Sequence, residues 1–230
     1  MSTTSTDRGI VAPGDAIVQR QPVEVSRYRG FTRANHWLTA ICAVVLLLTG
    51  FAFFHPSLYG LTALFGGGQT ARWLHPIVGV VMALSFFGLF VQMWRLNLPR
   101  KEDGEWTRKL GDVMKGNEEN LPELGKYNAG QKLMFWGMAG LLALLLLSGV
   151  AVWEEYFPNL VSIPVRRAAL AVHAVSALLM LLLFVLHVYA AIWTRGTLRA
   201  MTRGTVTGGW AWRHHRKWLR ALVARQDDRG

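Results

Sequence analysis

Cysteine is almost absent from this sequence, and long stretches of it carry hardly any charge. Cys42 is the single cysteine among 230 residues, which excludes a disulfide framework, an iron–sulfur cluster and a C-x-x-C-H site for covalent cofactor attachment. No internal repeat is evident either. Apolar residues make up 52% of the chain, so their distribution decides the fold class.

The apolar residues lie in four blocks rather than in a periodic pattern. The blocks cover residues 36–54, 76–94, 133–153 and 168–193. A helix needs about 20 residues to cross roughly 30 Å of hydrocarbon, and tryptophans near the block ends suit the headgroup level. The sequence therefore predicts an all-α integral membrane protein, a bundle of four transmembrane helices. Pro76 is expected in the first turn of the second helix, where its missing amide costs little.

Lysine and arginine are concentrated on one side of these expected helices. They are frequent before the first block, between the second and third blocks, and after the fourth, whereas the other two connections contain only Arg72, Arg166 and Arg167. Because basic residues favour the cytoplasmic side, both termini and the central loop are predicted to be cytoplasmic. Topology and anionic lipid then explain the formal net charge of +11, and nucleic-acid binding is not expected.

Three regions follow from this distribution. Residues 1–26 are polar and lack an apolar core, so they are predicted to be a disordered extension. The first apolar block comes too late and is too long for a cleaved signal peptide. Residues 27–195 are predicted to form the transmembrane domain, and residues 196–230 a basic cytoplasmic tail.

Two cytoplasmic segments carry more specific expectations. Tryptophans interleaved with arginines in the tail predict an interfacial segment on the inner leaflet, and His214 and His215 are interpreted as solvated or interfacial. Within the central loop, residues 106–114 are expected to form one short amphipathic helix.

Four of the seven histidines lie in or at the mouth of an apolar block: His36, His75, His173 and His187. His173 and His187 are 14 residues apart, and 14 steps of about 100° return almost to the same helix face while rising about 21 Å. In the predicted topology His36 matches the depth of His187, on the cytoplasmic side, and His75 that of His173, on the outer side. Two imidazoles fill both axial positions of a haem iron and leave no open site. The sequence therefore predicts two non-covalent haems b that transfer electrons, whereas four unrelated packing residues would give no depth-matched pairs.

Neighbouring residues add weaker signals. Gly79 is one turn from His75, and Gly50 lies at the expected depth of the outer haem, where a porphyrin needs small residues against a helix. Ordinary close helix packing explains either glycine equally well. His55 precedes Pro56 at a helix end, so it is interpreted as a turn residue rather than a haem ligand.

Four motifs occur over residues 27–220: R-x-x-H-W-x-x-A at residues 33–40, R-x-x-H-P at 72–76, Y-N-A-G-Q-K at 127–132, and H-x13-H at His173 and His187. Together they resemble the motifs of the cytochrome b, or gamma, subunit of respiratory formate dehydrogenase. The resemblance implies the same two histidine pairs as haem ligands, and a menaquinone or ubiquinone pocket beside the inner haem formed by Asn128, Gly130 and Gln131. The alternative for this last segment is a helix N-terminus capped by Asn128.

The resemblance also implies a role and partners. The chain would be the quinone-reducing electron-transfer subunit, in the bacterial inner membrane, of a complex with an iron–sulfur beta subunit and a molybdenum or tungsten alpha subunit that oxidises formate. This chain has neither the cysteines nor the nucleotide-binding glycines for those subunits' steps. The nearest alternative is the cytochrome b subunit of a hydrogenase or thiosulfate reductase. Alternatives of other classes are a transporter whose histidines relay protons and a purely structural membrane anchor.

Overall fold

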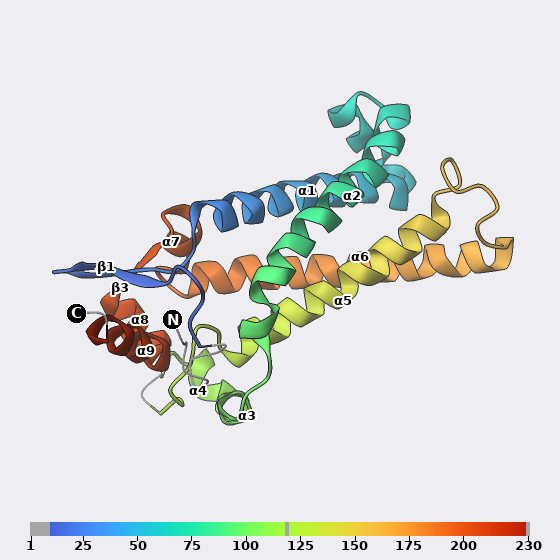
Figure 1. The fold of residues 1–230 in the computed structure, drawn as a ribbon. Coiled ribbons are helices and arrows are strands. Elements are labelled where there is room, and N and C mark those ends of the chain that lie inside the picture. Colours follow the sequence, from blue (N-terminus) through green and yellow to red (C-terminus); the bar gives the residue numbers. More distant parts are fainter. Residues whose placement is uncertain (1–9, 118–119, 229–230) are drawn as a thin grey trace. The chain divides into compact units, whose positions relative to one another are not determined.

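Four long helices dominate the computed structural model, which describes residues 10–117 and 120–228 (Figure 1). They are α1 (Gly30–Phe54), α2 (Gly68–Met93), α5 (Ala129–Val152) and α6 (Ile163–Trp193). Among the described residues, these are the helices long and apolar enough to cross a membrane. Only 6% to 17% of the residues in their most apolar windows are buried, so most of these apolar residues are at least partly exposed, as expected for helices that contact lipid. The prediction of a mostly helical membrane protein with four spans is confirmed, and the side on which the termini lie stays a prediction.

All four helices begin earlier than the apolar blocks indicated. The largest difference is in α2, which starts at Gly68, so that Pro76 lies inside the helix and not in its first turn. The expectation for Pro76 was therefore wrong, because a polar first turn of a membrane helix leaves no trace in a search for apolar runs. At Pro76 the missing amide deprives the carbonyl of Arg72 of its usual helical donor.

A 3-10 helix, η2 (Pro56–Phe65), connects α1 to α2. His55 precedes it in an extended conformation and accepts a hydrogen bond from the Ser57 amide at 3.2 Å through Nδ1. Gly66 and Gly67 end it with φ angles of 82° and 98°, which glycine adopts without steric cost. His55 is thus a turn residue, as the sequence indicated.

The central connection contains η3 (Trp94–Asn97), α3 (Lys101–Arg108) and α4 (Leu110–Met114). Two short helices therefore replace the single helix expected over residues 106–114, because Lys109 leaves the helical conformation at φ −97° and ψ 19°. Asp103 accepts a hydrogen bond from the Arg100 amide at 2.6 Å at the start of α3. The same carboxylate pairs with Lys132 of α5 at 2.7 Å.

A small antiparallel sheet joins the two ends of the chain. It comprises β1 (Ala16–Arg20), β2 (Val23–Ser26) and β3 (Thr205–Thr207), in the order β1-β2-β3. The short helices α7 (Thr197–Thr202), α8 (Gly208–His214) and α9 (Arg216–Asp227) complete this part. The structure is thus mostly helical, as predicted, but it also contains this sheet, which the sequence did not indicate.

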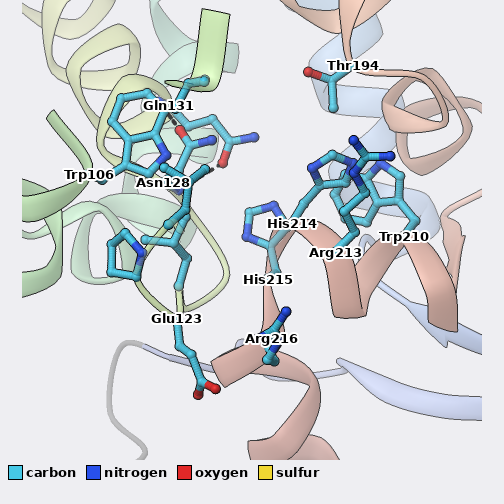
Figure 2. Close-up of a pocket in the computed structure, with 14 residues that line it drawn as sticks. Trp106, Glu123, Asn128, Gln131, Thr194, Trp210, Arg213, His214, His215 and Arg216 are labelled. Carbon is cyan, nitrogen blue, oxygen red and sulfur yellow. Dashed lines mark hydrogen bonds between the residues drawn. The ribbon is translucent and has the colours of Figure 1, made fainter. Parts of the chain in front are cut away.

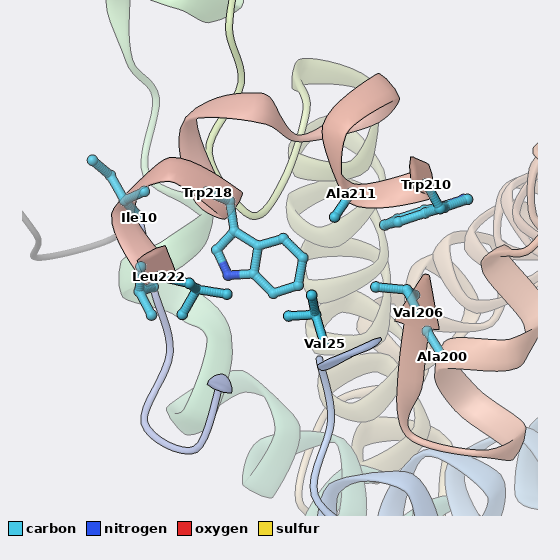
Figure 3. Close-up of a cluster of buried hydrophobic side chains, with 9 residues drawn as sticks. Ile10, Val25, Ala200, Val206, Trp210, Ala211, Trp218 and Leu222 are labelled. Carbon is cyan, nitrogen blue, oxygen red and sulfur yellow. The ribbon is translucent and has the colours of Figure 1, made fainter. Parts of the chain in front are cut away.

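The disorder expected for residues 1–26 is wrong from residue 10 onward, and residues 1–9 lie outside the described part. Val25 pairs with Val206 across the sheet, and both are buried against Trp218 and Leu222 of α9, as Figure 3 shows. The tail therefore folds onto the N-terminal strands. Trp218 is 0% exposed, so it serves this core and not the membrane interface expected for it.

The described residues divide into two compact units. One contains residues 34–90 and 137–188, which comprise most of the four long helices together with η2 and the α5–α6 connection. The other contains the sheet, the remaining short helices, the starts of α1 and α5, and the ends of α2 and α6. The predicted histidine pairs lie in the first unit and the predicted quinone segment lies in the second.

Candidate functional site

The helices bring the four intramembrane histidines together as two pairs of rings. The ring centres of His36 on α1 and His187 on α6 are 6.2 Å apart, with 43° between the planes. Those of His75 on α2 and His173 on α6 are 6.3 Å apart, with 62° between the planes. Two imidazoles bound to opposite sides of one metal, each with its nitrogen about 2 Å away, have ring centres roughly 6 Å apart. Both pairs therefore have the spacing of two axial ligands.

Hydroxyl groups fix the second of these pairs. Thr49 Oγ1 lies 2.7 Å from His75 Nδ1, and Ser148 Oγ lies 3.0 Å from His173 Nδ1. Each hydroxyl also donates to a carbonyl of its own helix, at 2.8 Å for Thr49 and 2.6 Å for Ser148. Because a hydroxyl has one proton, it accepts from the histidine. Both Nδ1 atoms therefore carry the proton, and Nε2 carries the lone pair that a metal binds.

Glycine backbone lies directly beside the same two rings. A Cβ atom at Gly50 would lie 3.6 Å from Cε1 of His75, and one at Gly149 would lie 3.4 Å from Cε1 of His173. At Gly79 it would meet only Leu46, at 3.9 Å. The sequence pointed to Gly50 and Gly79 but missed Gly149, because its position depends on how α5 packs beside α6.

The first pair also offers ligand atoms. His36 Nδ1 is buried and has no hydrogen-bond partner among the described residues. Each pair thus supplies two ring nitrogens, which matches the two axial positions that a porphyrin leaves on its iron. The ring spacing, the tautomers at His75 and His173 and the glycines beside them all fit a haem.

A polar cluster next to His36 ties α1 to α2. Asn35 Nδ2 donates to the Ser85 carbonyl at 2.8 Å, and Ser85 Oγ donates to Asn35 Oδ1 at 2.6 Å. A Cβ at Gly88 would come within 3.1 Å of Asn35 Nδ2, so glycine there makes room for the amide. The sequence alone did not indicate this cluster, since Asn35 and Ser85 carry no metal or redox chemistry of their own.

The predicted quinone segment lies at an open pocket in the other unit. The pocket has a volume of about 660 Å³, including space open to solvent. Its walls are Trp106, Asn128 and Gln131 on one side and Trp210, Arg213 and His214 on the other, as Figure 2 shows.

Asn128 and Gln131 also cap the start of α5. Asn128 Oδ1 accepts from the Gln131 amide at 2.8 Å, and Gln131 Oε1 accepts from the Asn128 amide at 3.1 Å. The two oxygens satisfy amides that the helix leaves without partners, and the side-chain NH₂ groups are the donors that a ligand would use. Gly130 lies against Trp106, where a Cβ would be 3.1 Å from Cη2, and it is not among the residues that line the pocket.

His215 forms part of the pocket wall and is 1% exposed. Its Nδ1 lies 2.8 Å from the Gly125 carbonyl and its Nε2 3.4 Å from Arg27 Nη2. Burial lowers the pKa of His215 well below its usual value, and the nearby Arg27 guanidinium lowers it further. The expectation of a solvated or interfacial His215 was wrong, because strands from the other end of the chain build the core that encloses it.

Acid should loosen this unit through His215. Between its usual pKa of about 6.5 and its lowered pKa in the folded state, the unfolded chain takes up a proton that the folded chain does not. The free energy of unfolding should be constant above pH 6.5 and should decrease below it, by up to about 1.4 kcal/mol per pH unit. Thermal unfolding of the detergent-solubilised chain from pH 8 to pH 5 measures this. His215→Gln should flatten the acid slope and His214→Gln should keep it, whereas an unchanged slope in His215→Gln would assign the effect to another group.

Comparison with known proteins adds independent information. Residues 27–204, which include all four paired histidines, match the family described as prokaryotic cytochrome b561. The chain is 42% identical over 198 residues to the formate dehydrogenase, cytochrome b556(fdo) subunit of Escherichia coli (strain K12), covering 86% of this chain and 93% of that protein. It is 38% identical over 199 residues to the formate dehydrogenase, cytochrome b556 subunit of Haemophilus influenzae, covering 86% and 84%. A more distant relative, 26% identical over 193 residues and covering 75% and 93%, is a putative protein-methionine-sulfoxide reductase subunit of Azospira oryzae.

Proposed function

We propose a function from the family of this chain, which belongs to the prokaryotic cytochrome b561 family and is a relative of formate dehydrogenase cytochrome b556 subunits. The proposed function is that of the membrane subunit through which a formate dehydrogenase reduces quinone. The family binds haem b. Two haems b are proposed here, one at His75 and His173 near the periplasmic side and one at His36 and His187 near the cytoplasmic side. The observation that carries this proposal is the pair of ring spacings, 6.2 and 6.3 Å.

Haem b, when bound, supplies a one-electron couple. The histidines would fill both axial positions at each iron, which prevents oxygen or substrate from binding there. Since α6 contributes one histidine to each pair, 14 residues apart, it holds the two pairs about 21 Å apart along the helix. Inward electron movement opposes an inside-negative potential at about 2.3 kcal/mol per 100 mV, so the subunit would conserve redox energy as membrane potential.

The pocket beside Asn128 and Gln131 is proposed to bind menaquinone or ubiquinone. Its indole rings, from Trp106 and Trp210, suit an apolar ring system, and the amide NH₂ groups suit a quinone carbonyl. Protons for quinone reduction would come from the cytoplasm, on the side to which the predicted topology assigns this segment.

Variants that keep the helix cap but remove the amide donors should weaken quinone binding. Asn128→Asp and Gln131→Glu each retain an oxygen for the α5 cap, so we expect helix content to persist while the quinone-analogue dissociation constant rises about tenfold, the equivalent of one hydrogen bond. Binding is measured by fluorescence quenching titration of the purified full chain. Asn159→Asp, in the connection between α5 and α6, is the control. Unchanged affinity in both pocket variants would place the quinone elsewhere.

The proposed partners are an iron–sulfur beta subunit and a molybdenum or tungsten alpha subunit, in the bacterial inner membrane. Affinity purification of the tagged chain should yield formate-oxidising activity. Hydrogen or thiosulfate oxidoreductase activity in its place would select the related alternative of a hydrogenase or thiosulfate reductase subunit.

The haem proposal is tested by the dithionite-reduced minus oxidised spectrum, with haem quantified per chain as the pyridine haemochrome. We expect two haems b per chain. Folded, haem-supplied protein without visible absorption would refute the proposal and favour a histidine proton relay.

A further inference from the structure

We propose that Thr49 and Ser148 are positioning residues that hold His75 and His173 in the iron-binding orientation and lower the reduction potential of the haem bound there. This inference rests on the proposed function, because it requires a haem at this histidine pair. It assigns a specific task to two hydroxyls that belong to neither of the ligands' own helices.

The contacts are made deep within the helical unit. Thr49 is 0% exposed and Ser148 is 6% exposed. Thr49 projects from α1 to His75 on α2, at 2.7 Å, and Ser148 projects from α5 to His173 on α6, at 3.0 Å. Each ligand of the pair is therefore held by a neighbouring helix, and the same arrangement occurs on both sides of the site.

The direction of each hydrogen bond follows from the second bond that each hydroxyl makes. The Thr49 proton goes to the Val45 carbonyl at 2.8 Å, and the Ser148 proton goes to the Leu144 carbonyl at 2.6 Å. With its only proton engaged, each hydroxyl oxygen must accept from the imidazole Nδ1–H. This fixes the tautomer, directs Nε2 to the metal and limits rotation of both rings.

Such a bond also tunes the iron. An imidazole that donates its Nδ1 proton to an acceptor becomes a more basic ligand, and a more basic axial ligand stabilises ferric over ferrous iron, which lowers the potential. At the other pair, His36 Nδ1 has no such acceptor among the described residues. A lower reduction potential at the His75–His173 haem would make electron transfer to the His36–His187 haem favourable. This would offset part of the free energy needed to move an electron inward against the membrane potential.

Redox titration of the full chain tests the inference. The haem that is lost in His75→Ala identifies which of the two midpoint potentials belongs to the His75–His173 pair. Thr49→Val and Ser148→Ala should each move the midpoint potential of that haem to a more positive value, and the double variant should move it further. Thr49→Ser and Ser148→Thr restore a hydroxyl and should stay near the wild-type value. The midpoint potential of the second haem should not change in any of these variants. Neither potential should change in Thr62→Val, whose hydroxyl belongs to another buried residue and donates to the Tyr59 carbonyl.

The outcomes separate the inference from the proposed function. Retention of both haems in His75→Ala would refute the ligand assignment itself. Loss of one haem in His75→Ala, with an unmoved potential in haem-loaded Thr49→Val and Ser148→Ala, would overturn the positioning role alone. If the valine in Thr49→Val crowds the site so that the haem is lost, the redox titration uses Thr49→Ala and Ser148→Ala. Loss of this haem from every hydroxyl-free variant but not from Thr49→Ser or Ser148→Thr would support the positioning role, because outer hydrogen bonds contribute about 10- to 100-fold to metal-site affinity.

Discussion

His75→Ala and His173→Ala are each expected to remove the same haem and leave one haem b per chain. His36→Ala and His187→Ala should each remove the other haem. The reason is geometric: each ring faces one partner, at 6.3 or 6.2 Å between centres, so loss of either leaves its iron with a single axial histidine. Haem per chain from the pyridine haemochrome, with the reduced-minus-oxidised α-band to identify the remaining haem, measures both parts of the prediction.

Double variants sharpen this test. His75→Ala combined with His173→Ala should still contain one haem, whereas His75→Ala combined with His36→Ala should contain none. His55→Ala is the matched control, because this histidine lies in the α1–α2 connection and caps η2 through Ser57. Both haems should remain in that control. Loss of different haems from His75→Ala and His173→Ala would contradict the pairing.

Which histidines lie close together could be predicted from the sequence, because the geometry of a long helix is regular. A spacing of 14 residues on one span, with the depth order set by the distribution of basic residues, suggests which histidines meet. The hydroxyls of Thr49 and Ser148 were not predictable in the same way. A threonine or serine inside a membrane helix usually bonds its own backbone, and its contact with a histidine depends on the rotation and the neighbours of each helix.

The sheet and the buried tail were missed for a related reason. Val25 and Val206 form one cluster with Trp218, yet neither end of the chain has enough apolar residues to suggest a core by itself. Their burial arises only when segments at opposite ends of the sequence meet, and composition of a single segment does not record such contacts. For Asn128 and Gln131 the sequence left two alternative interpretations, a helix cap or a binding pocket. In the structure their side chains do both, because they cap α5 and line the pocket.

Asp15→Asn should have the largest effect on the stability of this sheet-containing unit. The Asp15 carboxylate pairs with Lys126 Nζ at 2.6 Å, and both side chains are at most 3% exposed. It also accepts from Trp218 Nε1 at 2.9 Å. Burial lowers the pKa of Lys126 to about 8, an effect that Asp15 partly offsets. Removal of the carboxylate charge leaves a buried cation without its counter-ion, which costs about 3–5 kcal/mol.

Hydrogen exchange of β2 amides in the full chain measures this loss as a lower free energy of local opening. Lys126→Met in the Asp15→Asn background should recover much of the stability, because the uncompensated charge is then gone. Glu105→Gln provides the matched control: its i,i+4 pair with Lys109 is exposed, at 54% and 35%, and should contribute about 0.5 kcal/mol or less. A comparable loss from Glu105→Gln, or no recovery in the double variant, would show that the buried ion pair does not hold the N-terminal strands against the tail.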